Sequence, residues 1–174
     1  MDDGDDGWGE PVSIDDVPGI EMNQVGRIAA AASSVEFALF ACLTRLSGVT
    51  NIRVAFALFG GQQFEPALRL TKRVLAELRR EHRADAGPQW DAPLKAAKLA
   101  MDRRGVLMHS NWVGSLSDGG RQKGTAGFQP WRTMHRESDP EIFTAERLLA
   151  LGNELERAAN ALYELEQQIG TVAT

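Results

Sequence analysis

The apolar residues of this chain recur three and four positions apart over long stretches, which is the spacing of one face of an α-helix. In residues 21–48 this stripe comprises Val25, Ile28, Ala32, Val35, Leu39, Cys42 and Leu46. In residues 144–170 a second stripe comprises Leu148, Leu151, Leu155, Ala158, Leu162, Leu165 and Ile169. Two long stripes of this kind predict an all-α protein whose helices pack through them.

Three further helices are expected between these two, at residues 51–59, 64–82 and 90–108. Thr50 can cap the first of them, and Gly60-Gly61 can end it. The inward stripe of the helix at 90–108 comprises Leu94, Ala97, Met101 and Met108, with Arg104 on the same face. The pattern therefore predicts a bundle of four to five helices.

The region before the last helix has a different composition. Residues 113–128 contain five glycines, which is too many for a helix, and Asp118-Gly119 is a turn signal. Trp112 and Trp131 flank this region. We expect a Gly-rich loop or a short β-hairpin here, and Thr144 as the N-cap of the helix that follows.

Charge is distributed unevenly along the chain. Residues 1–20 hold seven acidic and no basic residues, whereas residues 69–136 hold fourteen basic and six acidic residues, within a net charge of −5. This predicts an acidic flexible tail at 1–19 and one helical domain at 20–174. The basic block is either the solvated face of a helix or a local surface that binds nucleic acid. In the second case, the acidic tail could compete with the nucleic acid for the basic block.

Several features favour a cytoplasmic protein. The acidic N-terminus is unlike the basic start of a secretion signal. The single cysteine, Cys42, fits a reducing compartment and excludes an internal disulfide. Residues 28–46 are the most apolar stretch, but Ser33, Glu36 and Arg45 interrupt it, so we expect no membrane span.

The sequence lacks a phosphate-binding glycine loop, a zinc or calcium motif and a serine nucleophile elbow, so we expect no metal and no cofactor. Arg104 is the unusual residue, because a charge on an inward stripe is costly unless it is paired or opens to a cleft. It could pair with a carboxylate such as Glu36, with His109 merely ending the helix. Gly105, inside the same helix, indicates a bend or a close neighbouring backbone.

The segment from Arg104 to His109 resembles the Arg-x4-His motif of HEPN domains. These all-α proteins include many metal-independent ribonucleases of toxin, antiphage and RNA-processing systems. Ser110, Asn111 and Trp112 resemble the usual continuation in small bacterial members, and the helix order over residues 21–170 is similar. Two positions depart from the pattern: Gly105 replaces the usual Asn or polar residue, and Asn111 replaces a Tyr of some toxins.

The resemblance implies a homodimer that cuts single-stranded RNA, with His109 as acid/base and Arg104 holding the phosphate. Arg103 is kept beside Arg104, because an Arg-x5-His spacing also occurs in the family. Arg103, Ser110, Asn111 and Glu36 are supporting candidates. The candidate RNA contacts are Arg73, Arg80, Lys98 and Trp112.

An antitoxin protein is a further partner that the resemblance implies. Two other interpretations stay open. The first is a HEPN-like bundle without catalysis, acting as a binding or regulatory module in which Gly105 marks lost chemistry. The second is a plain helical dimerisation protein whose basic block is only a solvated face.

Overall fold

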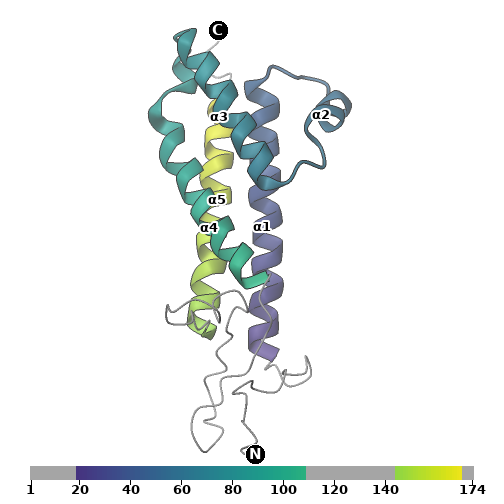
Figure 1. Ribbon diagram of the computed structural model, residues 1–174, viewed down its shortest axis with the longest axis vertical. Coiled ribbons are helices and arrows are strands. Elements are labelled where there is room, and N and C mark those ends of the chain that lie inside the picture. Colours follow the sequence, from purple (N-terminus) through teal and green to yellow (C-terminus); the bar gives the residue numbers. More distant parts are fainter. Residues whose placement is uncertain (1–18, 109–143, 170–174) are drawn as a thin grey trace, which may run out of the picture.

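The computed structural model describes residues 19–108 and 144–169. In this part of the chain there are five α-helices and no strand, so the predicted all-α helical bundle is confirmed (Figure 1). The helices are α1 (Gly19–Leu46), α2 (Ile52–Phe59), α3 (Phe64–Arg80), α4 (Asp91–Met108) and α5 (Ala145–Gln168). Two short 3-10 turns, η2 (Ala84–Ala86) and η3 (Pro88–Trp90), join α3 to α4. Residues 1–18 of the predicted tail and the Gly-rich region at 113–128 lie outside the described residues.

Four long helices form the bundle, and α2 stands beside it (Figure 1). The most extensive packing is between α1 and α5, followed by α4 with α5 and α1 with α3. α1 and α5 are parallel, since Arg27 in the first half of α1 meets Glu156 in the middle of α5, and Cys42, further along α1, meets Leu162, further along α5. α4 runs the opposite way beside α5 and α3. The segment that contains α2 leads from the end of α1 back toward its middle. α3 therefore starts there and runs in the same direction as α1 (Figure 1).

The two long apolar stripes form the core, as predicted. Every residue of the predicted stripe in α5 is buried, and so is every residue of the stripe in α1 except Val25, which is partly exposed. Cys42 lies inside this core, where its Sγ donates a hydrogen bond to the backbone oxygen of Leu162 at 3.2 Å. Burial raises the pKa of the Cys42 thiol to about 12, so the thiol is protonated and unreactive at neutral pH.

Helix caps fix where α2 and α5 begin. The hydroxyl of Thr144 accepts a hydrogen bond from the backbone N–H of Arg147, which confirms the predicted cap of α5. Thr50 was expected to cap α2, but this was wrong: Asn51 is the cap. Its side-chain oxygen accepts from the N–H groups of Arg53 and Val54 at 2.9 and 3.3 Å. A helix is capped by the residue directly before its first turn, and that residue is Asn51.

The end of α4 departs from two expectations. Met108 was expected to face inward but is exposed, and its neighbour Leu107, rotated by about 100° around the helix, is buried instead. Among the described residues, no close neighbouring backbone explains Gly105, since a Cβ placed there would meet none of their atoms within 4 Å.

One stretch of α1, Asn23–Leu46, has the length and the mean hydropathy (1.4) of a membrane-crossing helix. The expectation that its polar residues exclude such a match was too strong. In the bundle, however, the most apolar residues of α1 are core residues: Ile28, Val35 and Leu39 are fully buried against the other helices. A central core helix passes the same test of length and composition.

Candidate functional site

Arg104 lies near the end of α4, on the face that carries Ala97 and Met101 into the core. The side chain is half-buried, and its Nε atom is buried with no hydrogen-bond partner. No carboxylate among the described residues forms an ion pair with it. Within the described part of the chain, the Arg104 guanidinium is therefore half-buried without a carboxylate partner.

Glu36, which the sequence suggested as a partner for Arg104, is exposed on α1 and makes no such contact. It stands between Val35, which is fully buried, and Phe37, which is exposed. The adjacent position in a helix is rotated by about 100°, so the turn that places Val35 in the core directs Glu36 toward solvent. The proposed buried Arg104–Glu36 pair is therefore absent.

Arg103 differs from Arg104 although the two are adjacent. It is exposed, and its Nη1 donates to both carboxylate oxygens of Glu154 on α5 at 2.9 and 2.7 Å. This ion pair ties α4 to α5 on the surface. Of the two arginines considered as phosphate ligands, Arg103 is engaged by a carboxylate and Arg104 is not.

His109, the second fixed residue of the Arg-x4-His motif, lies outside the described residues. Ser110, Asn111 and Trp112, which follow it, lie outside them as well. Their sequence position places them directly after Met108, the last residue of α4.

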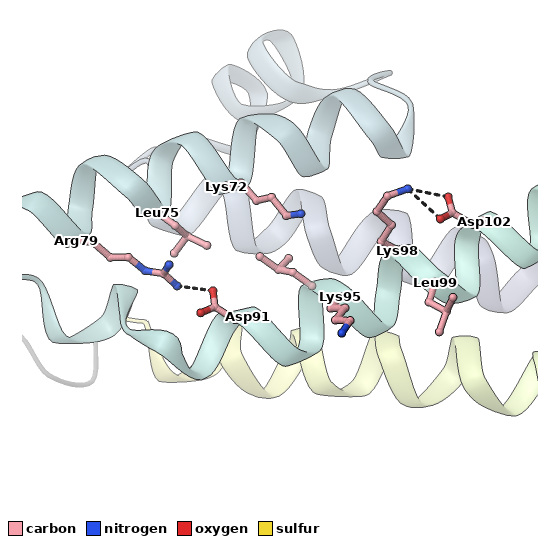
Figure 2. Close-up of a pocket in the computed structure, with 9 residues that line it drawn as sticks. Lys72, Leu75, Arg79, Asp91, Lys95, Lys98, Leu99 and Asp102 are labelled. Atoms are coloured by element: carbon pink, nitrogen blue, oxygen red, sulfur yellow. Dashed lines mark hydrogen bonds and ion pairs between the residues drawn. The ribbon is translucent and has the colours of Figure 1, made fainter.

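A groove of about 570 Å³ lies between α3 and α4 (Figure 2). Its lining combines apolar and charged side chains: Lys72, Leu75, Arg79, Asp91, Leu94, Lys95, Lys98, Leu99 and Asp102. Figure 2 shows Lys72 extending from α3 into the space between the two helices, whereas the amine of Lys95 points away from α3. The groove is thus the place where the basic block of the sequence forms a concave surface.

Most of the charges along the groove are neutralised by neighbours. Arg79 forms an ion pair with Asp91 at 2.8 Å and also donates to the backbone oxygens of Ala86 and Gly87. Lys98 donates to Glu65 and to Asp102, both at 2.9 Å. These bonds raise the pKa of Lys98, the bond to Glu65 most strongly.

Lys72 is the exception between the two helices. No described residue forms an ion pair or hydrogen bond with its amine. It belongs to the basic block seen in the sequence, but its place in a groove depends on α4 lying opposite. The regular spacing of Asp91, Lys95, Lys98 and Asp102 was the only sequence signal for the facing wall.

The candidate RNA contacts fall in different places. Arg73 is exposed on α3, and Arg80, also exposed, is held by Glu77 at 2.7 Å. Lys98 lines the groove but is occupied by its two carboxylates. The structure therefore does not bring Arg73, Arg80 and Lys98 together into one set of free cations.

Several apolar side chains of α4 and of the first part of α5 are exposed. They are Leu99, Val106 and Met108 on α4 and Leu149 on α5. The sequence interpretation had placed Met108 in the core and had not singled out the other three. Such side chains suit contact with another macromolecule.

The described residues contain no group of three or more His, Cys, Asp or Glu side chains that could hold a metal ion. Comparison with known proteins finds no matching family model, no similar curated protein and no similar solved structure.

Proposed function

We propose that the chain is a cytoplasmic, metal-independent endoribonuclease that cuts single-stranded RNA as a homodimer, in the manner of the HEPN domains that its motif resembles. The observation that carries this proposal is the state of Arg104, which is half-buried at the end of α4 and has no carboxylate partner among the described residues. A purely structural arginine in such a place would be expected to pair.

The proposed reaction uses the 2′-hydroxyl of RNA as its nucleophile. His109 takes the proton from this hydroxyl, because an imidazole with a pKa near 6.5 can both accept and return a proton near neutral pH. The 2′-oxygen then bonds to phosphorus and the bond from phosphorus to the 5′-oxygen breaks. The leaving oxygen takes a proton, and the products are a 2′,3′-cyclic phosphate and a 5′-hydroxyl. Arg104 stabilises the negative charge that develops on the phosphate.

The proposed site needs two chains. Five residues along an ideal helix correspond to a rotation of roughly 140°, so Arg104 and His109 of one chain diverge. A two-fold interface would bring two copies of each residue into one cleft. The exposed Met108, one helical turn from Arg104 on α4, supports such a contact, because it would be covered by the second chain. An antitoxin protein is a further proposed partner.

The test is an assay of the purified protein on a single-stranded RNA oligonucleotide in EDTA, with the all-2′-deoxy oligonucleotide of the same sequence beside it. We expect the RNA to be cut and the deoxy strand to stay intact, because only RNA carries the attacking hydroxyl. Cleavage that disappears in EDTA and returns with added Mg²⁺, or cleavage of the deoxy strand, would contradict the mechanism.

A binding or regulatory module without catalysis is the second candidate, favoured by Gly105. A Cβ at this position would meet no described atom within 4 Å, so packing among the described residues does not require the glycine. The motif of the family commonly carries Asn there. If the wild-type chain binds RNA without cutting it and Gly105→Asn restores cleavage, the chain is a HEPN-like module that has lost its chemistry.

Both candidates use the groove between α3 and α4, and we expect Lys72→Glu to weaken RNA binding about tenfold at low salt. The reason is that no described residue pairs with Lys72, and its reversal adds a negative charge to a groove that Asp91 and Asp102 also line. Fluorescence anisotropy with a labelled single strand measures the effect. Arg157→Glu, the same charge change at an exposed position of α5, is the control; an equal loss in both variants would show that only net charge matters.

A further inference from the structure

The α2 helix is unusually apolar for a helix outside the core. It reads Ile-Arg-Val-Ala-Phe-Ala-Leu-Phe, and Ala55 is its one buried residue. Four large side chains on it are exposed: Ile52, Val54, Phe56 and Leu58. It packs mainly against α1 and stands apart from the other long helices (Figure 1). Exposed apolar side chains gathered on one element indicate a surface that another molecule covers.

This surface continues onto α1 through stacked aromatic rings. Phe56 stacks on Phe40 with ring centroids 4.8 Å apart, and Phe40 lies 6.0 Å from Phe37, which is also exposed. We define the α1/α2 patch by the residues Phe37, Phe40, Ile52 and Phe56. Ile52 and Phe56 share one face of α2 because they are four positions apart, whereas Val54 and Leu58 lie on another face of the helix. The Asn51 cap and the aromatic contacts hold this patch in one arrangement.

The neighbouring outer face of α1 is uncharged and costs little to bury. Ala30, Ser33 and Ser34 are exposed there. The two serine hydroxyls each donate to the backbone oxygen four residues earlier, at 3.2 Å. Because these hydroxyls are already bonded within the helix, a partner can cover them without leaving an unpaired donor.

We propose that the α1/α2 patch binds a second copy of this chain in a two-fold symmetric contact. Three side chains of the patch, Phe37, Ile52 and Phe56, are 52–57% exposed. For large side chains of about 150–250 Å² each, this leaves on the order of 250–400 Å² of apolar surface. The adjacent Ala and Ser positions of α1 extend this area toward the roughly 800 Å² per partner of a stable interface.

The charges at the patch favour a second copy over an unrelated partner. Apart from Arg45, residues 28–64 contain only two charged side chains, Glu36 and Arg53, although 25% of the whole chain is charged. Both are exposed, they have opposite signs, and neither pairs with a described residue. A two-fold contact lets Arg53 of each copy meet Glu36 of the other, so the surface is complementary to itself.

This contact is separate from the proposed ribonuclease site. α2 stands beside the upper part of α1, whereas the last turns of α4, which carry Arg104, lie much lower in the bundle (Figure 1). The patch therefore cannot bring two copies of Arg104 together, and self-association through it does not depend on RNA cleavage.

The first test is the molar mass in solution of Phe56→Asp, measured by light scattering at micromolar concentration. We expect the mass to fall to half of the wild-type value, because an aspartate at the centre of the patch would be buried without a partner. Ala76→Asp, which places the same residue at an exposed position of α3, should keep the wild-type mass. An unchanged mass for Phe56→Asp, with its circular dichroism intact, would overturn the proposal.

The second test uses the symmetry of the contact. Arg53→Glu and Glu36→Arg should each weaken self-association at least tenfold, because each places like charges opposite one another. An equimolar mixture of the two variants should associate again, since a mixed dimer restores opposite charges at both positions. No recovery in the mixture would overturn the proposal. A monomeric wild-type chain that sediments with neutral phosphatidylcholine vesicles would also overturn it, in favour of a lipid surface.

Discussion

Replacing His109 or Arg104 with alanine is expected to lower the rate of RNA cleavage by about a hundredfold or more. The loss of His109 removes the group that exchanges protons with the 2′-hydroxyl and the leaving oxygen. The loss of Arg104 removes the cation that offsets the charge on the phosphate. Initial rates on a single-stranded RNA oligonucleotide, measured in EDTA, give the size of both effects.

Arg104→Ala also separates the catalytic role from a structural one. A buried Arg104–Glu36 pair would make this variant about 3–5 kcal/mol less stable. Glu36 is exposed and no described carboxylate depends on Arg104, so we expect the variant to keep its helical circular dichroism and its molar mass. Arg157→Ala on α5 serves as the matched arginine control. Full cleavage by the His109 variant, or an unfolded Arg104 variant with an inert wild type, would contradict the proposed role.

Trp90→Ala is expected to reduce the free energy of unfolding by about 3–5 kcal/mol. Trp90 is the largest fully buried side chain among the described residues, and its indole Nε1 donates to the backbone oxygen of Asp85 at 2.7 Å. The substitution opens a cavity and leaves that oxygen without its bond. Since small domains have about 5–15 kcal/mol of stability in total, this is a large fraction.

Urea denaturation followed by circular dichroism measures this loss. Trp90→Phe keeps most of the volume but not the indole donor, so we expect a smaller loss of about 1–3 kcal/mol. Leu99→Ala removes a side chain that is about half exposed and should change stability by less than about 1 kcal/mol. A loss below about 1 kcal/mol for Trp90→Ala would show that the turn before α4 does not support the core.

The sequence by itself determined the helices and their core faces. Every residue that the three-and-four spacing predicted to face inward between Leu148 and Ile169 is buried, although the spacing did not identify the buried Gly152 and Ala159, and Thr144 was identified as the cap of α5. These features are local, because the geometry of one helix fixes which of its residues share a face and which side chain can reach its first N–H groups. Where local rules failed, as at Thr50 and Met108, the cause was the end of a helix, where a shift of one residue changes the outcome.

Only the tertiary structure decided which charged and apolar groups have partners. Arg103 and Arg104 are adjacent in the sequence, but Arg103 meets Glu154 of α5 and Arg104 meets no described carboxylate. In the same way, α2 has a composition suited to a core, yet it leaves Phe56 and its neighbours exposed. Pairing and burial depend on residues distant in the sequence, and these are brought together only when α1, α3, α4 and α5 pack. The spacing within one helix carries no information about the charge or the surface that will stand opposite.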